Sequence, residues 1–76
     1  MKTVILPELG EGIDEAVVSF WHFSEGSSIG KGDDLVEIAT DKATFNVPAP
    51  ESGVIKKILR HEGEKAKVGE ALAELA

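Results

Sequence analysis

An internal repeat limits how this chain can fold more than any other feature of its sequence. Residues 16–38 align without a gap on residues 53–75 when the sequence is shifted by 37 positions. Both repeated glycines fall where each half needs a turn, and glycine adopts a positive φ at little steric cost. Two copies of one structural unit are therefore expected. The six identical pairs are Val17/Val54, Glu25/Glu62, Gly26/Gly63, Gly32/Gly69, Leu35/Leu72 and Glu37/Glu74.

A second, shorter match precedes the first. The segment Thr3–Pro7 resembles Thr44–Pro48 at a shift of 41 positions, so the first loop is expected to be four residues longer than its counterpart. Short strands separated by regular Gly and Pro residues favour an all-β sandwich or barrel over βαβ units. If a pseudo-twofold axis relates the halves, the last strand pairs with the first. The chain ends then lie opposite the turn at Asp41 and Lys42.

The C-terminal stretch, residues 63–76, has a composition that would also suit a helix. Its partner in the repeat, residues 26–39, contains three glycines, which disfavour a helix, so strands are predicted for both. The apolar side chains change face after Val18 and again after Ile55, which predicts a β-bulge in both long strands. The larger aromatic residues are expected to divide between core and surface: Phe20, Trp21, Phe23 and Phe45.

Composition restricts the size of the domain and its partners. The 76 residues suit one small domain, expected to span residues 1–76, and 42% of them are hydrophobic. Without cysteine there is no disulfide and no thiolate metal site. A net charge of −6 argues against nucleic acid and against anionic membranes, which bind Lys and Arg. The apolar runs are too short for a transmembrane helix or a signal peptide, so a soluble, intracellular domain is expected.

A β-hairpin is predicted around the sequence "EIATDKATFNV", with Asp41 and Lys42 as a two-residue loop. In this register apolar residues oppose apolar ones and polar residues oppose polar ones on alternate rungs, as the alternation of side chains along a strand requires. The loop lacks Asn-Gly or Asp-Gly, so a type I turn is expected, with Asp41 bonding the local backbone. The opposed pairs are Thr40/Ala43, Ala39/Thr44, Ile38/Phe45, Glu37/Asn46 and Val36/Val47.

The hairpin places Lys42 at its tip, where the lysine is a poor catalyst. An exposed lysine has a reference pKa of about 10.4 and stays protonated at neutral pH. A catalytic lysine is usually activated by desolvation or by a nearby cation, whereas Asp41 is an anion. Another enzyme can nevertheless acylate Lys42 after deprotonating it in its own site. The alternative is a solvated Asp-Lys turn without a function.

Three stretches resemble the lipoyl domains of dihydrolipoamide acyltransferases from 2-oxo acid dehydrogenase complexes. They are "LPELGEG", "EIATDKATFNVPAP" and "SGVIKKILRHEGEKAKVGEALAEL", and the resemblance covers nearly the whole chain. It implies a flattened β-barrel of two four-stranded antiparallel sheets with pseudo-twofold symmetry. It also implies that Lys42 carries lipoic acid in amide linkage, with Asp41 and Ala43 as flanking recognition positions.

The resemblance further implies a swinging-arm carrier that is not itself an enzyme. A lipoate–protein ligase or lipoyl transferase would modify Lys42. The lipoyl group would then visit a thiamine-diphosphate decarboxylase, the acyltransferase core and a flavin-containing dihydrolipoyl dehydrogenase, the cofactor carrying the chemistry. Tethering raises the effective concentration at each active site. The chain is expected to be an excised, monomeric domain of a longer acyltransferase, from a bacterial cytoplasm or, second, a mitochondrial matrix.

The first loop is a candidate recognition surface for the decarboxylase. Its segment "ELGEGIDE" contains four acids and no cation. In the family that the chain resembles, this loop lies near the lipoyl-lysine and helps the decarboxylase to recognise its carrier. Charge complementarity of this kind sets association rate and specificity more than affinity. Glu11, Asp14 and Glu15 are the proposed contacts; the alternative is a solvated, flexible loop.

Other functional classes fit the residues less well. Biotin carriers share the fold, but their lysine usually lies between two methionines, whereas Lys42 is flanked by Asp41 and Ala43. A glycine-cleavage carrier is a longer chain, and an unmodified β-sandwich interaction module remains the alternative from another class. No catalytic triad or carboxylate pair is indicated, and His22 and His61 without cysteine make a poor zinc site, so no metal is expected.

Overall fold

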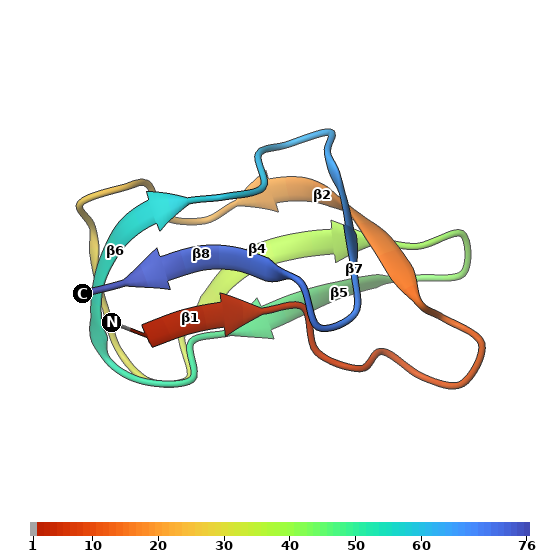
Figure 1. Cartoon of the computed structure of the whole chain (residues 1–76), viewed down its shortest axis with the longest axis horizontal. Helices are drawn as coiled ribbons and strands as arrows, with labels where there is room; N and C mark the ends of the chain where they lie inside the picture. The colour runs from red at the N-terminus through yellow and green to blue at the C-terminus, as the bar shows by residue number, and fades with distance from the viewer. Residues whose placement is uncertain (1) are drawn as a thin grey trace.

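The computed structural model describes residues 2–76, which form eight β-strands and no helix (Figure 1). The absence of helix agrees with the strands predicted for residues 63–76. No helix able to cross a membrane occurs in this part of the chain. The strands are β1 (Lys2–Ile5), β2 (Glu15–Trp21), β3 (Ser28–Ile29), β4 (Asp34–Ala39), β5 (Thr44–Pro48), β6 (Gly53–Ile58), β7 (Lys65–Lys67) and β8 (Ala71–Leu75).

Two four-stranded antiparallel sheets contain these strands, in the orders β1-β8-β6-β3 and β5-β4-β2-β7. The first half of the chain (β1–β4) and the second half (β5–β8) each contribute two strands to each sheet. The predicted sandwich and the pairing of the last strand with the first are therefore confirmed. The residues alone did not indicate β3 and β7, which are only two and three residues long.

Hydrogen bonds from backbone N–H groups to glutamate carboxylates repeat between the halves and confirm the pseudo-twofold relation. The Glu25 carboxylate accepts the Ile58 N–H at 2.8 Å, and the Glu62 carboxylate accepts the Trp21 N–H at 3.1 Å. These are the same bond in each half, because both pairs differ by 37 positions. Both bonds reach the far end of a long strand, just beyond the β-bulge that interrupts its pairing. The predicted bulges are present, and the repeated glutamates hold the strands that contain them.

The match predicted for the first strand is wrong by two residues. Val4 pairs with Ala73, and Val47 pairs with Val36, which is the counterpart of Ala73 in the repeat. Val4 is thus equivalent to Val47 at a shift of 43, and the first loop is six residues longer than its counterpart, not four. A slip of two residues leaves every side chain on the same face of a strand, so the apolar pattern could not distinguish the two alignments.

The core lies between the two sheets, and every buried side chain among residues 2–76 is hydrophobic. Trp21 is 7% exposed and donates its indole N–H to the Arg60 carbonyl at 2.8 Å, while Phe20 is 54% exposed on the outer face. Phe23 and Phe45 are partly buried against the core. The aromatic residues therefore divide as expected. The largest fully buried side chains are Leu6, Leu35, Ile38, Ile55, Leu72, Leu75, Val4, Val18 and Val36.

The sheets extend along a body of 32 × 20 × 17 Å. The start of β1 and the C-terminus lie together at one end, and the turn between β4 and β5 lies at the other (Figure 1). This is the separation that the repeat predicts. A tether attached at the chain ends would therefore leave the Asp41-Lys42 turn clear.

The turn between β7 and β8 is held by the Glu70 carboxylate. Its Oε1 accepts the Lys67 N–H at 2.6 Å, and its Oε2 lies 3.3 Å from Arg60 Nη2. The hydrogen bond from Lys67 is the main reason that the pKa of Glu70 lies below its usual value of 4.5; desolvation opposes this, and the Arg60 charge adds to it. In the other half, Asp33 accepts the Gly30 N–H in the same way at 2.8 Å.

Leu72→Ala is expected to lower the free energy of unfolding by about 2–5 kcal/mol, because Leu72 is fully buried and the smaller side chain leaves a cavity. Urea titration measures the change. Val54→Ala is the control, since Val54 is 37% exposed, and should change the stability by about 0.5 kcal/mol or less. Equal losses in the two variants would contradict the assignment of Leu72 to the core.

Glu70→Gln is expected to destabilise the domain at neutral pH and to have less effect in acid. A carboxyl with a lowered pKa in the folded state contributes stability above its unfolded pKa, and this contribution is lost as the pH falls through the folded pKa. Thermal unfolding of the wild type and the variant at pH 7 and pH 3 measures the difference. A difference in stability that is the same at both pH values would contradict this role of Glu70.

Candidate functional site

Lys42 lies at the tip of the β4–β5 hairpin in the predicted register. The pairs Val36/Val47, Glu37/Asn46, Ile38/Phe45 and Ala39/Thr44 are all present. Beyond them the Thr40 N–H donates to the Ala43 carbonyl at 2.8 Å and closes the two-residue loop. This agreement follows from the alternation of side chains, since a slip by one residue would turn Ile38 out of the core.

The side chain that holds the turn is Thr40, not Asp41 as predicted. The Thr40 hydroxyl oxygen accepts the N–H groups of Lys42 and Ala43 at 3.2 and 3.1 Å, and it donates to the Ala43 carbonyl at 3.1 Å. Threonine competes with aspartate for such local backbone bonds, so its place before Asp-Lys was the available signal. No residue other than glycine among residues 2–76 has a positive φ, which excludes the primed turns.

The side chains at the tip are open to solvent. Asp41, Lys42 and Ala43 are all exposed, and neither the Asp41 carboxylate nor the Lys42 ammonium forms a hydrogen bond or ion pair with another residue in the range 2–76. The Lys42 side chain is therefore available to a second protein. An acyl group in amide linkage on Lys42 Nζ would displace no contact of the described fold.

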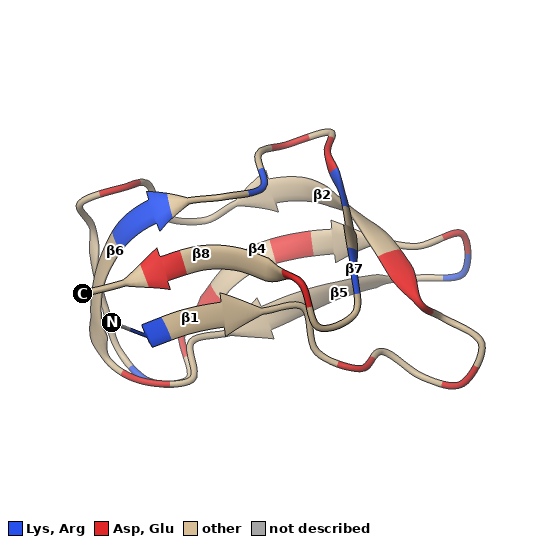
Figure 2. Cartoon of the chain, viewed as in Figure 1, with Lys and Arg blue, Asp and Glu red and all other residues tan. Residues whose placement is uncertain are grey.

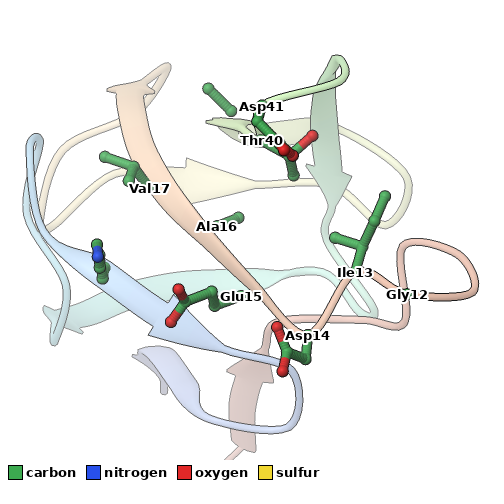
Figure 3. Close-up of a pocket in the computed structure, with 10 residues that line it drawn as sticks. Gly12, Ile13, Asp14, Glu15, Ala16, Val17, Thr40 and Asp41 are labelled. Atoms are coloured by element: carbon green, nitrogen blue, oxygen red, sulfur yellow. The ribbon is translucent and has the colours of Figure 1, made fainter.

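The first loop, between β1 and β2, lies at the same end of the molecule as this turn. A groove of about 480 Å³ separates them, lined by residues 12–17, residues 39–41 and Lys65. Figure 3 shows Thr40, Asp41 and Ile13 on one side of β2 and Glu15 on the other, with Asp14 where the loop enters the strand. Ile13 and Lys65 were not predicted as site residues. The resemblance implied that the first loop lies near Lys42, but only the folded structure brings Lys65 of β7 to the same groove.

The predicted acidic contacts are not equivalent in the structure. Asp14 and Glu15 line the groove with Asp41, whereas Glu11 is exposed on the loop and does not line it. Figure 2 shows that the loop carries acidic residues without a lysine or arginine. The Asp14 carbonyl accepts the Val68 N–H at 2.9 Å, which fixes the end of the loop to the β7–β8 turn.

The two histidines lie outside this site. Both are exposed; His22 Nε2 is 2.9 Å from Asn46 Oδ1, and its ring meets that of Phe20 edge-on at 5.3 Å. Among residues 2–76, no group of three or more His, Asp or Glu side chains is arranged to hold a metal ion.

Comparison with known proteins decides the family. Residues 2–75 match the Biotin_lipoyl family, described as "Biotin-requiring enzyme". The chain belongs to the biotinyl and lipoyl domain family. The solution structure of the lipoyl domain of the 2-oxoglutarate dehydrogenase complex from Azotobacter vinelandii superposes with a TM-score of 0.78 and 32% identity, over 100% of this chain and 96% of that one. This match confirms the resemblance to lipoyl domains and the sandwich of two four-stranded sheets.

Curated relatives of this lipoyl-type domain are components of 2-oxo acid dehydrogenase complexes. The succinyltransferase components of the 2-oxoglutarate complex from Staphylococcus saprophyticus and Rickettsia conorii are 40% and 42% identical over 96% and 95% of this chain. The acetyltransferase component of the pyruvate complex from Staphylococcus epidermidis is 36% identical over 92% of it. The chain spans only 16% to 18% of the length of these three relatives.

Proposed function

We propose that this domain is a lipoyl carrier in which Lys42 bears lipoic acid in amide linkage. The observation that carries the proposal is the position of Lys42, exposed and without an ion pair to any of residues 2–76, on a closed hairpin at the end of the molecule away from the termini. In the modifying enzyme, Lys42 Nζ would lose a proton and attack the activated carboxyl carbon, and the activating group would leave. Bound lipoic acid supplies an acyl-accepting and redox-active disulfide.

The chain itself contributes position and identity to this chemistry. The hairpin holds the lysine away from the body, and Asp41 and Ala43 beside it are the positions that a modifying enzyme would read. We propose that the domain acts as a carrier and is not an enzyme by itself. The distance from the termini leaves room for a partner enzyme to close over the tip.

The partners proposed for the modified domain follow from its relatives. Those relatives are acyltransferase components of 2-oxoglutarate and pyruvate dehydrogenase complexes, so this domain would serve a complex of the same general class. It would meet a lipoate–protein ligase or lipoyl transferase, a thiamine-diphosphate decarboxylase, an acyltransferase core and a dihydrolipoyl dehydrogenase. Glu11, Asp14 and Glu15 would face the decarboxylase, because their loop lies at the end of the molecule that carries Lys42.

Incubation with lipoic acid, ATP and a lipoate–protein ligase is expected to add one lipoyl group, located at Lys42 by intact mass and peptide mapping. Lys42→Arg should abolish the adduct, because the guanidinium is not acylated by this route. Lys31→Arg is the matched control, since Lys31 also lies in an exposed turn, and should leave the adduct in place. An adduct on another lysine, or one formed only with biotin and its ligase, would overturn the proposal.

Neutralising Glu11, Asp14 and Glu15 together (to Gln, Asn and Gln) is expected to slow reductive acylation of the lipoylated domain by its decarboxylase. We expect a loss of about threefold to tenfold in kcat/KM at low ionic strength that shrinks with added salt, as for charge-steered association. Stopped-flow acylation at several salt concentrations measures it. The control neutralises Asp34, Glu51 and Glu74, which lie toward the end that holds the termini. Equal rates in the two triple variants would remove the recognition role.

A further inference from the structure

The turn that presents Lys42 is built differently from four other tight turns within residues 2–76, at 24–27, 30–33, 61–64 and 67–70. In each of those four turns, the backbone N–H of the first residue donates a hydrogen bond to the side-chain oxygen of the residue three positions later. The acceptors are Ser27, Asp33, Glu64 and Glu70. Each of those turns also has a glycine with a φ close to +90°, at Gly26, Gly32, Gly63 or Gly69.

At the tip of β4–β5 the side chain of the first residue accepts N–H groups of later residues, which is the reverse of the other four turns, and no glycine of positive φ is present. The first residue of the turn, Thr40, supplies the side chain, and its hydroxyl accepts the N–H groups of the third and fourth residues, Lys42 and Ala43. The same hydroxyl donates to the Ala43 carbonyl. One side-chain oxygen therefore makes three of the four hydrogen bonds that close this loop, the fourth being Thr40 N–H to Ala43 C=O.

The missing glycine has a physical consequence for a turn that must carry a side chain at its tip. A two-residue loop without positive φ does not match the twist of the flanking strands and tends to splay them. Local backbone bonds from a hydroxyl oppose that tendency. The bond to Lys42 N–H also fixes the peptide from which the Lys42 side chain projects.

We infer that Thr40 is a positioning residue for the modification of Lys42: its hydroxyl holds the Lys42 and Ala43 peptides in the conformation that the modifying enzyme engages. This inference rests on the proposed function, since it concerns the efficiency with which Lys42 is modified. It adds to Asp41 and Ala43 a residue whose side chain acts through the backbone. The lysine is then presented in one conformation before the ligase binds.

The test compares Thr40→Val, Thr40→Ala and Thr40→Ser with the wild type. Valine keeps the branched shape but removes the hydroxyl, alanine removes both, and serine restores the hydroxyl. Thr44→Val is the matched control, because Thr44 is exposed on the adjacent strand and its hydroxyl makes no hydrogen bond within residues 2–76. The readouts are kcat/KM for lipoylation by the ligase, the amide hydrogen exchange of Lys42 and Ala43, and the urea midpoint of unfolding.

We expect Thr40→Val and Thr40→Ala to lower kcat/KM for lipoylation by about threefold to tenfold, the range set by one or two local hydrogen bonds. Amide exchange at Lys42 and Ala43 should quicken by a similar factor. Thr40→Ser should return both quantities to near the wild-type values, while Thr44→Val should change neither. The urea midpoint of each variant should show that the domain stays folded under the assay conditions, so a loss of rate would not reflect unfolding.

Two results would overturn the inference, and they differ from failure of the proposed function. Wild-type kcat/KM in both Thr40→Val and Thr40→Ala would show that the hydroxyl does not position Lys42, while Lys42 would remain the attachment site. An equal loss in Thr44→Val would show that the effect is not specific to the turn hydroxyl. A wild-type domain that accepts no lipoyl group would instead overturn the carrier function and the role of Thr40 together.

Discussion

The pairing of strands between the two halves of the chain is the constraint on which the rest of this structure depends. Each sheet takes its two edge strands from one half and its two central strands from the other. Neither half can therefore satisfy its backbone hydrogen bonds or cover its apolar face alone. A domain this small, without a disulfide, depends on hydrophobic burial for its stability, so the two halves must fold together. The pairing of β1 with β8 also brings the two ends of the chain together.

The pairing of strands between the two halves decides where the site can lie. The hairpin β4–β5 joins the halves, and by the pseudo-twofold relation its position corresponds to that of the chain ends in the pair β8 and β1. At one end of the molecule a closed turn joins β4 to β5, whereas at the other end the corresponding strands β8 and β1 carry the two chain ends. A carrier that is tethered by its ends and presents a lysine on the closed turn makes direct use of that difference.

The two halves differ in the first loop and in the turn at Asp41 and Lys42, and these are the segments to which we assign a function. The first loop is six residues longer than the loop between β5 and β6, and Gly12, Ile13 and Asp14 of this loop line a groove with Thr40 and Asp41, at the end away from the termini. The turn at Asp41 and Lys42 has no counterpart in the other half of the described residues 2–76, and a threonine hydroxyl closes it without a glycine of positive φ. The repeated parts, such as Glu25 and Glu62, hold the scaffold and are the same in both halves.

The sequence by itself determined the strand class, the hairpin register and the position of Lys42, because these depend on alternation between neighbouring residues and on glycine at turns. Only the tertiary structure decided the alignment of the first strand, since a slip of two residues preserves that alternation. It also decided that Trp21 is buried while Phe20 is exposed, which depends on the bulge in β2. The groove beside Thr40 and Asp41 likewise required the fold, because it depends on how segments far apart in the sequence come together. The structure also decided that the side chain of Thr40, and not that of Asp41, bonds the backbone of the turn, because both side chains compete for the same local N–H groups.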